Sequence, residues 1–431
     1  MLTAFARAFR TPDLRKKILF TLFIIVVFRI GSILPTPNVN VKVLKETADA
    51  AKDSNQLYGL VDLFSGGALL KLSVFALGIM PYITASIILQ LLTVVIPRLE
   101  ALKKEGQAGT TKITQYTRYL TVGLAILQAT GIVAMASTGQ LFQGISGSGE
   151  ILYDTGIFPI ITMVIIMVAG TTVIMWLGEL VTDRGVGNGM SILIFTQVVA
   201  IFPAQFWSIY KTKNGFVFAI VILVGLAIMA GVVFVEQAQR RIPVQYAKRM
   251  VGRRMYGGTS TYIPLKVNQA GIIPIIFASS LLYLPVLATQ LWPETKWLQK
   301  VQPYLQQDNA WHMGIFFVFI IFFTYFYVAI TFNPTEVADN MKKYGGFIPG
   351  IRPGRPTAEY LDFVLTRITT PGALYLGLVS LIPMVAFALM KASQDFPFGG
   401  TSILIVVGVG LDTVKQIESQ LQQRNYEGFL R

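Results

Sequence analysis

Long apolar runs, separated by shorter polar stretches, dominate the chain. A helix needs roughly 20 apolar residues to cross the hydrocarbon core of a membrane. Ten segments approach or reach that length: 18–34, 72–96, 118–137, 157–181, 189–207, 215–236, 270–292, 312–333, 369–391 and 400–411. The pattern therefore predicts an all-α polytopic membrane protein with ten transmembrane helices.

Composition agrees with a membrane protein. Of the 431 residues, 53% are hydrophobic and 13% are charged, whereas a soluble domain usually carries about 25% charged residues. The chain has no cysteine and one histidine, His312. Disulfides, thiolate nucleophiles and two-histidine metal sites are therefore excluded, and we expect no cofactor. His312 follows Trp311 at the start of a predicted span, so we expect it at the membrane interface.

Basic residues are distributed unequally between the two sides that ten spans would define. If the N-terminus is cytoplasmic, a count along the sequence puts 26 lysines and arginines in cytoplasmic segments and 8 in outer ones. Cytoplasmic loops of membrane proteins carry such an excess. The distribution therefore predicts that both termini are cytoplasmic. Ten spans also divide into two five-helix halves, 1–207 and 208–431.

Two of the predicted cytoplasmic loops are unusually long. They cover 237–269, which carries seven basic residues, and 334–368, which is rich in glycine and proline. A shorter cytoplasmic tail, 412–431, follows the last span. Long loops in a compact protein are usually functional, so we expect the two loops to dock partners. The alternative is a topology signal that touches anionic lipid.

A polar stretch precedes the second predicted span. It reads VDLFSGGALLK (61–71). Its charged residues and its glycine pair make it a poor membrane span, and an amphipathic helix at the interface is one alternative. Pro81, inside the predicted span, removes one backbone hydrogen-bond donor. The sequence does not decide whether the helix bends there.

Several kinds of chemistry have no support in the sequence. The segment DRGVGNGMS (183–191) lacks the lysine of a phosphate-binding loop, and we interpret it as a tight turn that lets two helices approach closely. No Walker A pattern occurs, so directional work would need a partner or a gradient. The spans hold no ladder of acidic or histidine residues. A secondary transporter and an intramembrane hydrolase are therefore the disfavoured alternatives.

Two long motifs carry a family resemblance. The segments FALGIMPYITASIILQLLTVV (75–95) and WLGELVTDRGVGNGMSILIF (176–195) resemble the signature segments of the SecY family, whose members form the central subunit of the bacterial protein-conducting channel. Further matches include FRIGSILPTP (28–37) and the two long cytoplasmic loops. The resemblance covers nearly the whole chain and is weakest at 138–156 and 293–311.

The resemblance implies a channel with a narrow constriction, an outer plug and a lateral gate between the second and seventh helices. By motif position, the constriction ring consists of Ile79, Ile83, Met190, Ile194, Ile276 and Ile405. The plug falls at 57–71, with Asp62, Phe64, Ser65, Gly66 and Gly67, and the gate candidates are Gln90 and Asn268. Met190 stands where the family usually has isoleucine.

The resemblance also implies a function and partners. Members of the family pass unfolded secretory preproteins across the cytoplasmic membrane and release apolar segments, such as signal sequences, into lipid. The motor ATPase SecA or the translating ribosome drives them, and they work with SecE and often SecG. The partner-docking positions match Arg249, Arg253, Arg254 and Arg352. We therefore expect a channel subunit of the inner membrane, and not an enzyme.

Overall fold

The ten predicted spans all overlap helices. The computed structural model describes residues 9, 11–44, 68–69, 71–137, 152–212, 215–246, 249–251, 254–256, 260–291, 304, 309–390 and 400–429. The overlapping helices are α2 (Pro12–Ile33), α5 (Met80–Val95), α7 (Gln107–Ser137), α8 (Ile157–Arg184), α9 (Gly189–Thr212), α10 (Gly215–Gln237), α11 (Ile273–Leu291), α13 (Ala310–Thr331), α15 (Arg355–Met390) and α16 (Gly400–Phe429). Two shorter helices, α6 (Pro97–Lys104) and α14 (Pro334–Lys343), follow α5 and α13.

Not every one of these helices is long and apolar enough by itself to cross a membrane. Within the described residues, five helices meet that requirement: α7, α8, α10, α13 together with α14, and α15. The number is six if α5 and α6, which meet at a 99° bend, count as one broken span. The chain is thus a multi-pass membrane protein.

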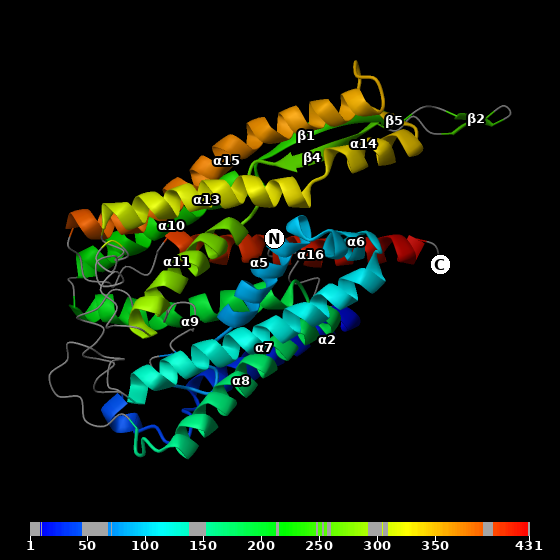
Figure 1. Ribbon diagram of the computed structural model, residues 1–431. Coiled ribbons are helices and arrows are strands. Elements are labelled where there is room, and N and C mark those ends of the chain that lie inside the picture. The colour runs from blue at the N-terminus through cyan, green and yellow to red at the C-terminus, as the bar shows by residue number, and fades with distance from the viewer. Residues whose placement is uncertain are drawn as a thin grey trace.

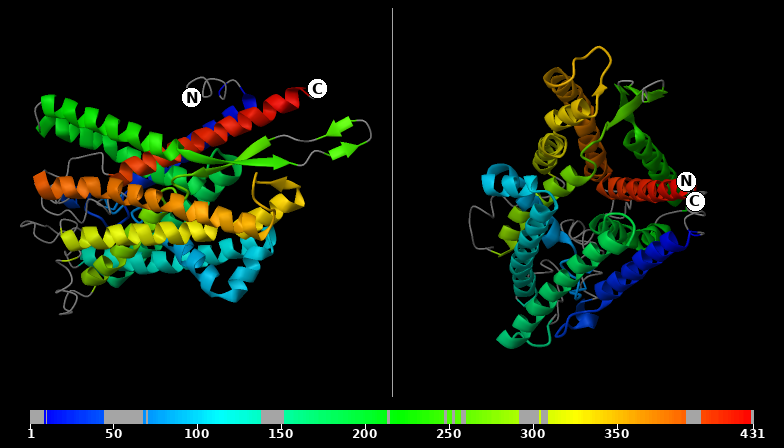
Figure 2. Two further views of the ribbon diagram at one scale, coloured as in Figure 1. Left: turned by 90° about the horizontal axis from the view of Figure 1, so that it is seen from above. Right: turned by 90° about the vertical axis from the view of Figure 1, so that its right-hand side faces the viewer.

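The helices pack side by side in two opposed groups. Figure 1 shows α2, α7 and α8 on one side, α13 and α15 on the other, and α9 and α16 between them. The described parts of the predicted cytoplasmic loops, together with the end of α16, gather at one end of the bundle (Figure 2). We call this end the loop end.

The second predicted span differs from the expectation, because its helix begins at Met80 and not at residue 72. Leu72 has a φ of +42° and Gly78 a φ of +56°, so residues 71–79 form turns. The backbone carbonyl of Leu72 accepts a 2.9 Å hydrogen bond from the N–H of Thr36. Pairing with the chain after α2 therefore replaces the helix here.

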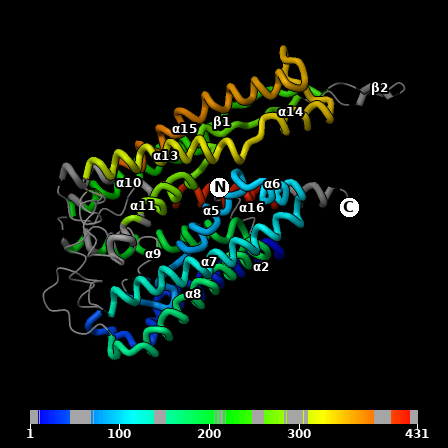
Figure 3. The backbone as a smooth tube through the Cα atoms, in the orientation of Figure 1, coloured from blue at the N-terminus to red at the C-terminus, as the bar shows by residue number. Residues whose placement is uncertain are grey.

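Pro81 does not kink α5. It lies in the first turn of the helix, where a backbone N–H has no intrahelical partner in any case. The sharp change of direction comes at Ile96, between α5 and Pro97 at the start of α6. Figure 3 follows the chain through that bend and on into α7.

The two long loops are not purely helical, so the all-α expectation is wrong in detail. Strands β1 (Gln239–Tyr246) and β4 (Ser260–Lys266) form an antiparallel hairpin, and β5 (Gly346–Phe347) from the second loop pairs with β1. A smaller pair, β2 (Arg249–Val251) and β3 (Arg254–Tyr256), extends the hairpin.

A hydrophobic cluster of its own holds the two loops together. Ile242 and Val244 of β1 are buried against Met341 of α14 and Leu361 of α15. Pro243, which lies between them, is exposed, because successive side chains of a strand point to opposite faces. We call β1, β4, β5, α14, the chain between β5 and α15 and the first turns of α15 the hairpin module.

The tight turn predicted at 183–191 is confirmed. Helix α8 ends at Arg184 and α9 begins at Gly189. A Cβ added to Gly189 would collide with the carbonyl group of Gly178 on α8. The N–H of Gly189 also donates a 2.9 Å hydrogen bond to the hydroxyl of Thr182. The glycines therefore let the two helix backbones touch.

Candidate functional site

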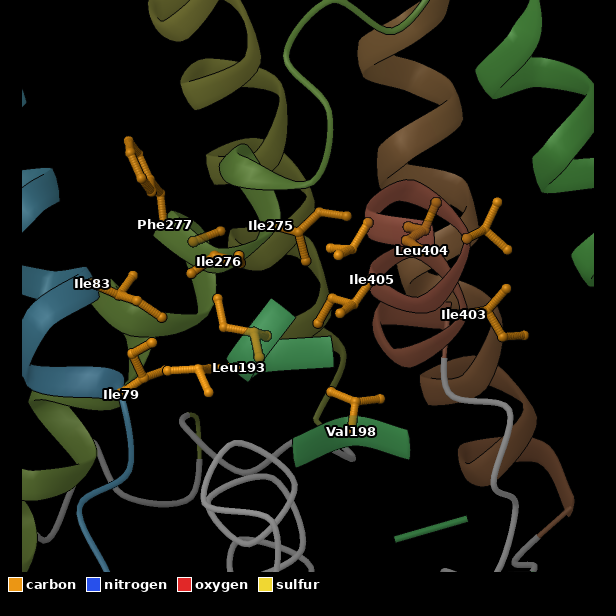
Figure 4. Close-up of a cluster of buried hydrophobic side chains, with 14 of the residues drawn as sticks. Ile79, Ile83, Leu193, Val198, Ile275, Ile276, Phe277, Ile403, Leu404 and Ile405 are labelled. Atoms are coloured by element: carbon orange, nitrogen blue, oxygen red, sulfur yellow. The ribbon is translucent and has the colours of Figure 1, made fainter. Parts of the chain in front are cut away.

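The predicted ring residues lie together at the centre of the bundle. Ile79, Ile83, Ile194, Ile276 and Ile405 belong to one hydrophobic cluster, and each is at most 9% exposed. We call these five side chains the collar. They come from the start of α5 and from α9, α11 and α16. Figure 4 shows Ile79 and Ile83 facing Ile276 and Ile405.

Met190, the sixth predicted ring residue, packs against the same cluster and is partly buried. A Cβ added to Gly178 would lie 2.5 Å from the sulfur of Met190. The methionine side chain therefore runs over the bare backbone of α8 at Gly178. A flexible thioether fits such an irregular gap better than a β-branched side chain does.

Sequence reasoning missed further residues of this cluster. Leu193 of α9 is fully buried and lies close to Ile79 in Figure 4, and Ile275 of α11 is 1% exposed. Both are apolar residues in apolar spans, so hydropathy alone gives no signal for them. Leu193 and Ile275 extend the aliphatic cluster. Such an aliphatic lining excludes water and ions, and it contains no hydrogen bonds that would have to break when its side chains move apart.

The gate candidates do not meet. Gln90 of α5 is exposed, and Asn268 lies in the turn before α11 and not on that helix. The side-chain amide of Asn268 donates hydrogen bonds to the carboxylate of Glu236, at 2.6 Å, and to the carbonyl of Gly271, at 3.2 Å. Helices α5 and α11 do pack against each other. The polar contact at this place thus joins α10 to α11.

Most of the predicted plug lies outside the described residues. This applies to Asp62, Phe64, Ser65, Gly66 and Gly67. At the described end of the segment, Ala68 and Leu69 are buried. The carbonyl of Ala68 accepts a 3.1 Å hydrogen bond from the N–H of Ser73. The segment is thus anchored next to the turns that lead into α5.

Three of the four predicted docking arginines lie within the described residues, on the hairpin module or on its β2–β3 extension. Arg249 lies on β2 and Arg254 on β3, whereas Arg253 lies outside the described residues. Arg352 is exposed. It stands between Gly350 and Gly354, whose φ angles of +84° and +105° favour glycine. Because β5 of the second loop pairs with β1 of the first, the two loops supply one surface.

That surface keeps its positive charge exposed. The described side chains of Arg240, Arg241, Lys342 and Lys343 are all exposed, like that of Arg352. Arg241 stacks over the ring of Tyr262, with 4.8 Å between its guanidinium carbon and the ring centroid. Planar, exposed guanidinium groups suit phosphate and carboxylate partners, because they bond to both in two places.

An ion pair between α7 and α8 was not predicted. Arg118 donates two hydrogen bonds of 2.9 Å to the two carboxylate oxygens of Glu179. The side chains are 41% and 23% exposed, respectively. His312, in the first turn of α13, is 5% exposed and stacks on Phe316, whereas Trp311 is 65% exposed.

The geometry defines a class of protein: a multi-pass helical membrane protein with an aliphatic collar at its centre and a basic module at one end. The model of the SecY family matches residues 73–414. Over the whole of both chains, the sequence is 68% identical to the protein translocase subunit SecY of Streptomyces coelicolor and 60% identical to that of Mycobacterium tuberculosis H37Rv. The chain belongs to the SecY family.

Solved structures agree in fold. A structure described as a protein conducting channel aligns with a TM-score of 0.62 at 16% identity, covering 94% of this chain and 92% of that one. Canine Sec61 in a ribosome-channel complex aligns with a TM-score of 0.59 at 16% identity and the same coverage.

Proposed function

We propose that polypeptides cross the membrane through the collar, between α5, α9, α11 and α16. The observation that carries this proposal is that five isoleucines from four separate segments are buried in one hydrophobic cluster. An aliphatic constriction holds back water and ions. Its side chains can also rotate aside without breaking hydrogen bonds. The chain is then a channel subunit that moves unfolded secretory preproteins, and not an enzyme.

The full arrangement of ten spans in two halves, 1–207 and 208–431, belongs to this proposal, with both termini in the cytoplasm. The excess of basic residues in the loops at the loop end supports it. The membrane is then the cytoplasmic membrane. Segment 57–71 is the plug, and it seals the collar from the outer side.

The lateral gate is proposed between α5 and α11, which pack against each other. Gln90, on the exposed side of α5, is a contact for an entering apolar segment. Asn268, just before α11, holds the start of that helix to α10 by its hydrogen bond to Glu236. Opening would let a signal sequence pass from the pore into lipid.

The hairpin module is the proposed docking surface for the energy source, which is either SecA or the translating ribosome. Exposed Arg352 and the β2–β3 extension with Arg249 and Arg254 support this assignment, and Arg253 is included by its place in the sequence. Structures of canine Sec61 and of the yeast Ssh1 complex on ribosomes share the fold. Binding to ribosomal RNA would be directed at the phosphate backbone and would weaken with salt. SecE and SecG are the proposed membrane partners.

Photo-crosslinking tests the channel. A photoreactive amino acid at Ile79, Ile83 or Ile276 should crosslink to a secretory chain arrested during export. The same probe at Leu281, which is 40% exposed on α11, should react with lipid and serves as the control. Export without any crosslink from the collar positions would refute the proposed path.

A further inference from the structure

Two buried polar side chains next to the collar have no hydrogen-bond partner in the described part of the chain. The first is Gln197 of α9, which is 1% exposed and whose amide nitrogen and oxygen are both unpaired among the described residues. Gln197 follows Leu193 by four residues and Ile194 by three, so all three share one face of α9. That face is the one that enters the collar cluster.

The second is Ser280 of α11, which is 5% exposed. Its hydroxyl has no partner among the described residues. Ser280 follows the collar residue Ile276 by four residues and therefore lies directly next to it on the same face. On α16, Ser402 precedes the collar residue Ile405 by three residues and is 2% exposed.

The adjacent hydroxyl groups show that the missing bonds are not a general property of these helices. Ser279 donates a 3.0 Å hydrogen bond to the carbonyl of Ile276, and Thr196 donates one of 2.8 Å to the carbonyl of Ile192. Hydroxyls in helices usually bond to the preceding turn in this way. Gln197 and Ser280 instead keep their polar atoms free of their own helices.

The three polar positions lie on the same side of the collar. Helices α9 and α11 run away from the loop end, and α16 runs towards it (Figure 1). Gln197 follows Ile194 and Ser280 follows Ile276 along the chain, whereas Ser402 precedes Ile405. All three are therefore displaced by about one helical turn towards the end of the bundle opposite the hairpin module.

A buried amide without a partner is unfavourable, so natural proteins retain one only where something else compensates. A polypeptide in extended conformation brings backbone N–H and C=O groups that the collar cannot bond. The amide of Gln197 offers one donor side and one acceptor side, which is the pattern that matches a peptide group. A hydroxyl offers both as well.

We propose that Gln197 and Ser280 form a peptide-binding site next to the collar. This site hydrogen-bonds to the backbone of the translocating chain as the chain leaves the apolar constriction. The inference rests on the proposed function, because it requires that the chain pass through the collar. The contact is independent of sequence, since every residue of the passing chain except proline carries both backbone groups.

Crosslinking with a neighbouring control tests the inference. A photoreactive amino acid is placed at Gln197 and Ser280, and, as a control, at Leu281, the neighbour of Ser280 that is 40% exposed. In the intact translocase with an arrested secretory chain, positions 197 and 280 should crosslink to that chain at least as strongly as Ile276 does. Position 281 should not.

A second measurement uses transport rate. Gln197→Leu removes both polar atoms at similar size, and we expect translocation to slow about two- to tenfold, as the loss of one hydrogen bond predicts. Thermal stability of the resting protein should not fall, because an unpaired group has been removed. Thr196→Val is the control and should leave the rate unchanged.

The outcomes distinguish failure of the peptide-binding site from failure of the proposed channel. Crosslinks from Ile79 and Ile276 with none from positions 197 or 280 would agree with the proposed channel and would overturn the peptide-binding site. No crosslink from any of these positions would overturn the channel itself. A Gln197→Leu variant that transports at the normal rate would show that the unpaired amide is only a structural defect, and would also overturn the inference.

Discussion

Asn268 and Glu236 form a buried 2.6 Å hydrogen bond between the turn that begins α11 and the end of α10. The two residues are 3% and 9% exposed, respectively. Because the amide of Asn268 also bonds to the carbonyl of Gly271, a single side chain fixes the entry into α11 in two directions. Any movement of the start of α11 relative to α10 must bend or break this connection.

Asn268→Leu should therefore destabilise the protein. The substitution leaves the carboxylate of Glu236 buried without its donor, and the loss of such a partner costs about 1–3 kcal/mol. Thermal unfolding in detergent measures the effect. Glu236→Gln keeps an acceptor for the amide and is the control, with a smaller expected loss. Equal losses in the two variants would show that the hydrogen bond does not matter.

The ion pair between Arg118 and Glu179 should couple α7 to α8. Polar pairs between membrane helices measure about 0.6 kcal/mol on average and up to about 1.7 kcal/mol, and the two-bond geometry here favours the upper part of that range. A double-mutant cycle with Arg118→Gln and Glu179→Gln gives the coupling energy.

The pair between Lys104 and Glu100 on α6 provides the comparison. It is a single 2.7 Å contact, with side chains 75% and 52% exposed. Exposed pairs four residues apart on a helix contribute about 0.3–0.5 kcal/mol. A coupling for Arg118 and Glu179 no larger than that would contradict a structural role for the pair.

Gly189→Ala should be far more harmful than Gly231→Ala. The added methyl group at 189 would collide with the backbone of Gly178, whereas nothing lies within 4 Å of the methyl position at 231. The first variant must separate α8 from α9 and should reduce the amount of folded protein in the membrane. The second should be neutral or stabilising by about 1 kcal/mol, since alanine has the higher helix propensity. Similar membrane levels of both variants would contradict the close approach.

A polar residue in the collar should open a path for ions. Ile276→Asn places an amide at a buried point of the cluster, which favours hydration of the constriction. Ion conductance of the resting channel in planar bilayers should rise. Leu281→Asn, on an exposed part of the same helix, is the control and should leave the conductance low. A low conductance in the Ile276→Asn variant would argue against the collar as the seal.

The sequence predicted the apolar segments and the α8–α9 turn well, because both depend on local residue types. Residues 72–79 were predicted as helix, since their side chains are as apolar as those of the helix that follows. Their turns depend on backbone pairing with Leu34 and Thr36, which hydropathy does not register. The hairpin was predictable in part, because Ile242 and Val244 alternate with exposed residues.

Contacts between distant residues could not be predicted in the same way. Arg118 and Glu179 are separated by 61 positions, and neither residue type determines the other. Asn268 was assigned to a gate helix by its motif, but its actual partner, Glu236, is set by how α10 and α11 pack. The unpaired state of Gln197 likewise appears only once its neighbours are placed around it.

Reversal of the charge at Arg352 should block motor-driven export and leave the protein inserted. Arg352 is exposed on the hairpin module between Gly350 and Gly354, and its carbonyl accepts a 2.8 Å hydrogen bond from Thr357. The backbone bond holds the turn whatever side chain stands at 352, so Arg352→Glu should change charge without unfolding the loop. SecA-dependent transport into membrane vesicles should fall at least tenfold, about the effect of 1.4 kcal/mol in binding. Arg355→Glu is the matched control, because Arg355 is exposed nearby but already paired with Glu359 at 2.9 Å. If Arg352→Glu vesicles transport normally, or if both variants lose the same activity, Arg352 is not a specific docking contact.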